Sequence, residues 1–178
     1  MLKTFLDKPD MPKNSKLLTD NEVETALDAG PAALTELLLK RLKAAVGDQL
    51  TAETIKRLSV GQITLLVYGC FRREMMEGGM VQLIHNGYGP FVFDNPFAKV
   101  MKLWGLKDFS KMLYKARHLY VEHRDRLTQY CSEDDFMALY EQHPQLDNID
   151  DEYIEKETAV TNDIAAYVAG HLQDFNEI

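Results

Sequence analysis

The chain has 178 residues, of which 46% are hydrophobic and 27% charged, and its net charge is −8. A chain of this length can bury roughly two-thirds of the surface that its unfolded form exposes, so it needs no metal or disulfide to hold a core. No window approaches the ~18 apolar residues of a membrane span, which predicts a soluble protein with no membrane contact.

Two cysteines, Cys70 and Cys131, lie far apart in the sequence, and the first lies in a strongly apolar stretch. A buried free thiol suits that setting better than a disulfide, and free thiols are typical of a reducing compartment. We therefore expect a cytoplasmic location.

The charge is spread unevenly along the chain. Residues 131–178 contain 13 acidic residues and a single basic one, Lys156, whereas residues 1–130 contain 15 acidic and 19 basic residues. Such asymmetry indicates a surface that meets positive charge.

Residues 1–18 contain two prolines and several lysines without any periodic pattern, which predicts an extended or partly disordered arm. Thr19 and Glu22 then form a capping box, in which each side chain accepts a hydrogen bond from the other residue's backbone. The pattern predicts a short helix that ends at Gly30.

Pro31 suits the first turn of a second helix, where its missing N–H is not needed, and Gly47 supplies the end. The apolar side chains of this segment recur on one helix face: Leu34, Leu37, Leu38, Leu42 and Val46. Thr51 begins a third, short helix that reaches Leu58.

The stretch from Ser59 to Pro90 dominates the chain. Ser59 and Gln62 form a second capping box, and the residues that follow are apolar on almost every side until Gly78 and Gly79. A helix that is apolar all round is one that other helices surround, so we expect a buried central helix.

Asn95 as cap and Pro96 at the first helical position predict a further helix that Gly105 ends. A long amphipathic helix follows over residues 108–130. Its inward positions are Phe109, Leu113, Ala116, Leu119, Tyr120 and Leu127.

Ser132 caps the next helix, which runs toward Pro144 as a breaker, and a last helix extends from about Asp150 to Phe175. The apolar positions of this last helix are Tyr153, Ile154, Val160, Ile164, Tyr167, Val168, Leu172 and Phe175. Alternating strand patterns and internal repeats are missing from the sequence. We predict an all-α fold over residues 19–178, a single compact domain of about eight helices around the central one.

Glu74 and Glu77 lie in the last turn of the central helix, where the negative end of the helix dipole disfavours carboxylates. With His85 nearby they could form an acid/base pair or hold a metal, but Glu-x-x-Glu occurs once and a helical di-metal site needs Glu-x-x-His pairs. The alternative is structural: one carboxylate turns past the two glycines to accept N–H groups from the next helix start. No catalytic, nucleotide or metal motif is present, so we expect no enzyme activity, cofactor or metal.

A run of basic residues could bind the phosphates of a nucleic acid, form ion pairs with the chain's own acidic third, or simply face solvent. The acidic total and the proximity of the acidic third favour ion pairing within the chain over direct nucleic-acid binding. The run comprises Lys99, Lys102, Lys107, Lys111, Lys115, Arg117, Arg124 and Arg126.

The acidic third contains Asp147, Asp151 and Glu155 at intervals of four, which stacks them roughly 6 Å apart along one helix ridge. Duplex DNA carries one charge per about 1.7 Å of its axis, so further carboxylates are required to imitate it. The candidates for a partner-binding surface include Asp150, Glu152, Glu133, Asp134 and Asp135. The alternative is that these acids only keep the protein soluble.

The segment Glu74-x-x-x-Gly78-Gly79-Met80-x-Gln82-Leu83-Ile84-x-Asn86-Gly87 resembles the signature of the bacterial DNA-mimic protein family. The likeness covers about residues 55–175, although Glu77 stands where the family has Asn. It implies a helical, dimeric domain whose acidic surface occupies the DNA-binding face of a transcription factor. The signature itself is interpreted as a folding device, formed by Glu74, Glu77, Gly78, Gly79, Gln82, Asn86 and Gly87.

We therefore predict a non-enzymatic, acidic protein-interaction module that binds a basic protein, with a DNA-binding transcription factor as the first candidate and a homodimer as the expected assembly. An immunity or structural protein that binds through an apolar patch is one alternative. The other is a hydrolase-type enzyme that uses Glu74, Glu77 and His85.

Overall fold

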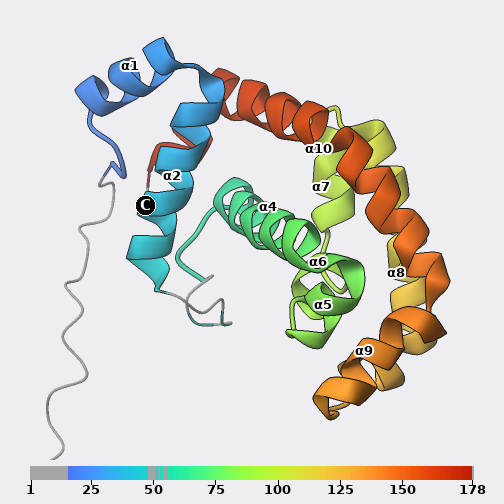
Figure 1. Ribbon diagram of the computed structural model, residues 1–178. Helices are drawn as coiled ribbons and strands as arrows, with labels where there is room; N and C mark the ends of the chain where they lie inside the picture. Colours follow the sequence, from blue (N-terminus) through green and yellow to red (C-terminus); the bar gives the residue numbers. More distant parts are fainter. Residues whose placement is uncertain (1–15, 48–50, 52, 54–55, 178) are drawn as a thin grey trace, which may run out of the picture.

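Helix α4, Val60–Glu77, lies at the centre of the chain in the computed structural model, which describes residues 16–47, 51, 53 and 56–177 (Figure 1). Within these residues the chain forms ten helices and no strand, so the predicted all-α fold is confirmed. The central helix is surrounded as expected. Its neighbours are α2 (Pro31–Val46), α5 (Gly79–His85), α6 (Gly89–Phe93), α7 (Phe97–Leu103), α10 (Pro144–Gly170) and α11 (Gln173–Asn176).

The predicted capping residues begin three of the helices. The capping box of Thr19 and Glu22 opens α1, Asp20–Ala29, and that of Ser59 and Gln62 opens α4. The Ser132 hydroxyl accepts the first-turn N–H of α9, Glu133–Gln142. Each cap satisfies backbone donors that have no partner inside the helix, which contributes about 1 kcal/mol to stability.

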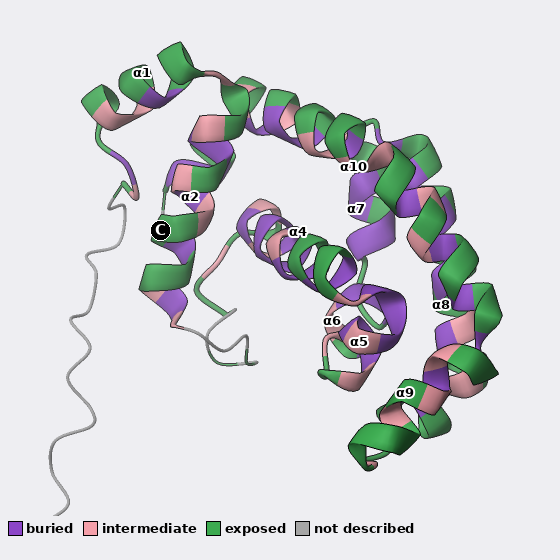
Figure 2. Cartoon of the chain, in the orientation of Figure 1, coloured by how far each residue is buried: buried purple, intermediate pink, exposed green. Residues whose placement is uncertain are grey.

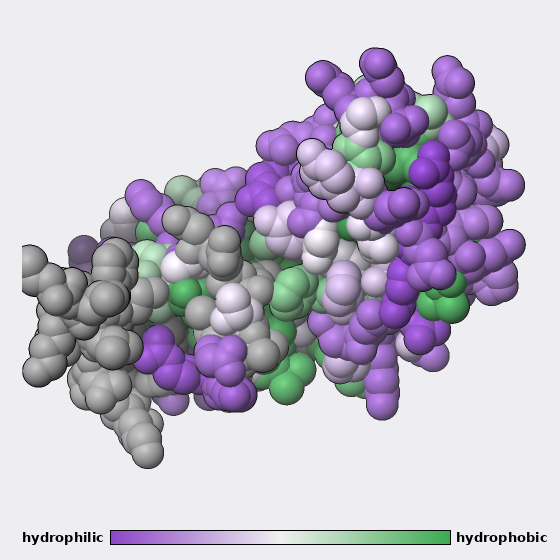
Figure 3. Space-filling view, turned by 90° about the horizontal axis from the view of Figure 1, so that it is seen from below, coloured by the Kyte–Doolittle hydropathy of each residue, from purple (hydrophilic) through white to green (hydrophobic). Residues whose placement is uncertain are grey.

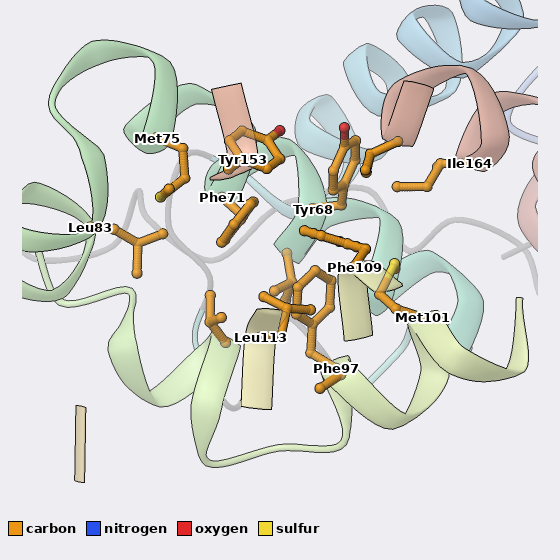
Figure 4. Packing of buried hydrophobic residues seen from close by; sticks show 14 of the residues in the cluster. Tyr68, Phe71, Met75, Leu83, Phe97, Met101, Phe109, Leu113, Tyr153 and Ile164 are labelled. Atoms are coloured by element: carbon orange, nitrogen blue, oxygen red, sulfur yellow. The ribbon is translucent and has the colours of Figure 1, made fainter. Parts of the chain in front are cut away.

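Aromatic rings from three helices fill the core around α4 (Figure 4). The ring of Phe71 meets Tyr153 of α10 edge-on at 5.0 Å between centroids and Phe109 of α8 (Lys107–Thr128) at 5.5 Å. Edge-to-face pairs of this kind stabilise a core beyond their buried area. Figure 2 shows the matching pattern on α8 and α10, where buried residues face inward and exposed residues face outward.

Helix α9 ends before Pro144 as predicted, and Pro144 also begins the next helix. It occupies the first turn of α10, where proline loses no hydrogen bond, so the helix starts six residues earlier than the predicted Asp150. The helix also stops at Gly170, before the short α11. Ile154 is 53% exposed and was wrongly assigned to the inner face, which Tyr153 occupies one position earlier.

Three smaller predictions meet different outcomes. Asn95 accepts the N–H of Phe97 at 3.0 Å, but α7 starts at Phe97, so Pro96 precedes the first helical position. Residues 52, 54 and 55 of the predicted helix from Thr51 to Leu58 fall outside the described residues, as do residues 1–15 of the predicted arm. The helices that the eight-helix estimate did not separate are short, such as α6 and α11.

The start, the centre and the end of the described chain meet at one place. Asn176 accepts the N–H of Leu18 at 2.7 Å and donates to its carbonyl at 3.1 Å. The Gln62 amide, already part of the α4 cap, donates to the carbonyl oxygens of Phe175 and Glu177. Leu18 is fully buried, so the last residue of the predicted arm is part of the packed structure.

No helix among the described residues is both long enough and apolar enough to span a membrane.

Candidate functional site

The carboxylate of Glu74 lies at the centre of the signature segment, and the residue is only 3% exposed. It accepts hydrogen bonds from the side-chain amides of Gln82 at 3.0 Å and Asn86 at 2.8 Å, and from the Arg73 guanidinium at 2.7 Å. Arg73 in turn donates to the Tyr88 hydroxyl at 2.8 Å. Three donors from two segments therefore close the turn between α4 and α5 around one buried charge.

Burial by itself would raise the pKa of the Glu74 carboxyl, but the hydrogen bonds from Arg73, Asn86 and Gln82 outweigh it and lower the pKa below its ordinary value. The same ion pair raises the pKa of Arg73. The carboxylate is ionised at neutral pH, and both of its oxygens accept hydrogen bonds from the protein's own side chains.

The two glycines of the turn are required for different reasons. Gly79 has φ +73, a left-handed conformation that costs other residues energy, and an added Cβ would lie 2.1 Å from a carboxylate oxygen of Asp150. At Gly78 an added Cβ would lie 2.1 Å from the Gln82 side-chain oxygen. Gly87 also has positive φ, +85, but open space where a Cβ would stand.

The donors that the structural interpretation assigned to Glu74 are wrong. Glu74 binds side-chain amides beyond the glycines, and not the backbone N–H groups at the start of α5. The Met80 N–H at that start donates instead to the Asp150 carboxylate of α10, at 2.9 Å. Helix α5 has glycine at its N-cap, which has no side chain to accept a hydrogen bond, so the acceptor comes from another helix.

The three residues of the catalytic alternative have different surroundings. Glu77 is exposed, and the ring of His85 packs against Phe136 at 4.7 Å between centroids. Over the described part of the chain, Glu74, Glu77 and His85 make no hydrogen bond to one another, and no group of three or more acidic, histidine or cysteine side chains could hold a metal ion. Cys70 and Cys131 are both free thiols, as predicted.

The acidic residues of the predicted partner-binding set divide into two groups. Six are exposed, and none of these six forms an ion pair within the described residues; we call them the α9–α10 carboxylates: Glu133, Asp134, Asp135, Asp147, Asp151 and Glu155. The other two are engaged by the fold. Asp150 binds the Met80 N–H, and Glu152 pairs with Lys115 at 3.2 Å and Lys156 at 2.8 Å.

The expectation that the basic run neutralises the acidic third is wrong for most of its members. Among the described residues, the ion pair of Lys115 with Glu152 is the one that joins the two groups. Lys111 pairs with Asp108, and Arg124 with Asp94, both outside the acidic third. The reason is that α8 and α10 meet through buried apolar side chains such as Phe109 and Tyr153, so their charged faces point to solvent.

Tyr140 and Asp150 were missed by the sequence reasoning as partners of the signature. The Tyr140 hydroxyl donates to the Gly78 carbonyl oxygen at 2.9 Å, a contact between residues 62 positions apart. Local patterns carry no signal for such a contact. The uncapped start of α5 was the one available hint that a distant acceptor must exist.

These features define an all-helical protein in which a buried glutamate closes a double-glycine turn and the final helices expose unpaired carboxylates. The sequence model of the DMP19-like protein family matches residues 56–171, and the chain belongs to this family. The chain is also 31% identical, over 127 residues, to the DNA mimic protein DMP19 of Neisseria meningitidis serogroup B, in an alignment that covers 71% of this chain and 77% of the relative. The resemblance to the DNA-mimic proteins is therefore confirmed.

Proposed function

We propose that this protein mimics DNA, with the α9–α10 carboxylates in the place of phosphates, and binds the DNA-binding face of a cytoplasmic transcription factor. The observation that carries the proposal is that six exposed carboxylates on two adjacent helices lie without an ion-pair partner among the described residues. The relative's description as a DNA mimic supports it.

Charge density sets a condition on this mimicry. Asp147, Asp151 and Glu155 follow one ridge of α10 with roughly 6 Å between neighbours, whereas a duplex has one charge per about 1.7 Å. The three acidic residues in the first turn of α9 add charge beside this ridge. A homodimer, which we include in the proposal, would double the number of carboxylates available.

A non-enzymatic role fits the use of the signature residues. The buried carboxylate of Glu74 is saturated by donors from the protein itself, so it has no free oxygen for substrate chemistry. We propose that the signature serves the fold and that binding falls to the exposed carboxylates.

Binding through an apolar patch has no comparable support. The large exposed hydrophobic residues are distributed over α1, α4, α7, α8, α9, α10 and the connection between α8 and α9, and single exposed apolar residues are normal on a protein surface. Seen from below in Figure 3, hydrophobic areas on the side formed by α8, α9 and α10 are small and separate within a hydrophilic surface.

The proposal is tested by capturing partners from a native lysate of the source organism at low and high salt, then asking whether this protein displaces DNA from the captured protein. Charge-driven binding weakens steeply as salt rises. We expect the triple variant Asp147→Lys, Asp151→Lys and Glu155→Lys to lose at least about tenfold in affinity, because close opposite charges become like charges.

The matched control is the triple variant Glu24→Lys, Asp28→Lys and Glu36→Lys, which changes the net charge equally at exposed positions on α1 and α2. We expect it to retain binding. Equal losses in the two variants, or binding that ignores salt, would refute the proposed surface.

A further inference from the structure

Three contacts join the signature turn to the two helices that carry the exposed carboxylates. The Tyr140 hydroxyl of α9 donates to the Gly78 carbonyl oxygen, and the Asp150 carboxylate of α10 accepts the Met80 N–H, each at 2.9 Å. The rings of His85 and Phe136 add a third contact at 4.7 Å between centroids. Each of the three joins a side chain of α9 or α10 to the segment Gly78–His85.

The turn is shaped to receive these side chains. An oxygen of Asp150 occupies the space in which a Cβ of residue 79 would stand, 2.1 Å from the ideal position, so only glycine leaves room for it. The Met80 N–H belongs to the first turn of α5 and has no acceptor inside that helix. The second glycine of the signature thus opens a place for α10, and the helix start after it supplies the donor.

The rotation of α10 about its axis follows from this contact. Asp150 lies between Asp147 and Asp151 in the sequence, and successive helical residues are about 100° apart around the axis. With Asp150 directed to the turn, Asp147, three positions before it, and Asp151, one position after it, are both exposed. Tyr140 plays the same part in α9. Its hydroxyl donates to the Gly78 carbonyl oxygen of the turn, and the adjacent Glu141 is exposed.

We propose that Tyr140 and Asp150 are positioning residues that lock α9 and α10 onto the double-glycine turn, so that the signature fixes the direction in which the α9–α10 carboxylates point. That Tyr140 and Asp150 hold the two helices in place does not depend on the proposed function, whereas the consequence for partner binding rests on it. It connects a buried motif that binds nothing itself with the surface that we propose for the partner.

The test compares backbone amide hydrogen exchange in two double variants. Tyr140→Phe with Asp150→Ala removes the lock, and Tyr114→Phe with Asp151→Ala makes the same chemical changes at exposed positions. We expect exchange over residues 133–155 to be at least about tenfold faster in the lock variant than in the control, and exchange in α2 to be the same in both. Equal exchange over residues 133–155 would overturn the inference.

A conservative substitution separates positioning from general loss of stability. Asp150→Asn keeps an oxygen that can accept the Met80 N–H, so when it replaces Asp150→Ala in the double variant, exchange should slow to the rate of Tyr140→Phe alone. Should the double variant fail to fold, Tyr140→Phe alone removes a single hydroxyl, and we expect faster exchange confined to α9 and the start of α10. Exchange at the wild-type rate in that single variant would contradict the lock.

Binding to the protein captured in the salt experiment separates this inference from the proposed function. The lock variant retains all six α9–α10 carboxylates, and we expect it to bind at least about tenfold more weakly because they no longer share one fixed arrangement. Faster exchange together with unchanged affinity would confirm the lock and refute the proposed binding surface. Unchanged exchange would refute the lock alone.

Discussion

The carboxylate of Glu74 accepts a hydrogen bond from the side-chain amide of Asn86, with 2.8 Å between the oxygen and the nitrogen. The two residues stand twelve positions apart and enclose the whole of α5. Glu74 therefore holds both the middle and the C-terminal end of α5, because Gln82, within the helix, donates to the same carboxylate.

Glu74→Ala should lower the free energy of unfolding by about 3 kcal/mol, because it removes a buried carboxylate and leaves the side-chain amides of Gln82 and Asn86 and the Arg73 guanidinium without their acceptor. Urea unfolding followed by circular dichroism measures the change. Glu77→Ala, at an exposed position in the same helix turn, should stay within about 0.5 kcal/mol of wild type. Similar losses of stability in both variants would show that the effect comes from the position at the helix end and not from the hydrogen bonds around Glu74.

Gly79→Ala and Gly87→Ala should differ in cost, although both glycines have positive φ, +73 and +85. Alanine in this conformation costs about 1 to 2 kcal/mol at either site. At Gly79 the methyl group also collides with Asp150, whereas at Gly87 it meets open space. We expect Gly79→Ala to be less stable than Gly87→Ala by at least about 1 kcal/mol in the same unfolding assay, and equal values would argue against close packing at the turn.

The pH dependence of stability should contain a contribution from Asp150. Burial raises the pKa of its carboxyl to about 7 from an ordinary 3.8, while the hydrogen bond from Met80 acts in the opposite direction. The folded state then binds more protons than the unfolded state between these values, so this residue's contribution to the free energy of unfolding decreases as pH rises from about 4 to about 7.

Asp150→Asn removes that titration and keeps the acceptor. At pH 8 it should be more stable than wild type by about 1 kcal/mol, a value reduced from the full shift because the side chain is partly exposed, and at pH 4 the gain should vanish. Chemical unfolding across this pH range measures both. Asp151→Asn, at an exposed neighbouring position, should show the same pH dependence of stability as wild type. If the stability difference between Asp150→Asn and wild type did not change with pH, the raised pKa of Asp150 would be contradicted.

Asn176→Ala should cost about 2 kcal/mol, because it removes two buried hydrogen bonds to the backbone of Leu18. The N–H of Leu18 should become one of the fastest exchanging amides near the core. Asp174→Ala, whose side chain is exposed, serves as the control and should leave that amide protected.

The helix starts were predictable because their signals are local. Thr19 with Glu22 and Ser59 with Gln62 lie within one helical turn, and each pair forms the expected capping box. The central helix was predictable for a related reason, since side chains that are apolar all round leave a helix no solvent face.

The arrangement of the carboxylates was not predictable from the same patterns. Asp150 and Asp151 are chemically identical neighbours, yet one is bound to Met80 and the other is exposed. The distinction depends on how α10 is rotated, and the contact that distinguishes them joins Asp150 to Met80, 70 positions away in the sequence. Pro144 correctly marked the end of α9, but the start of α10 at the same residue was missed because proline suits both the end of one helix and the first turn of the next.

The bonds from Gln62 to the carbonyl oxygens of Phe175 and Glu177 have a consequence for biosynthesis. A ribosome delivers α4 long before it delivers Phe175 and Glu177, whose carbonyl oxygens accept hydrogen bonds from the Gln62 amide nitrogen. During synthesis α4 therefore lacks these two acceptors until residues 175–177 have been added, so the packing of the central helix is completed only after that point.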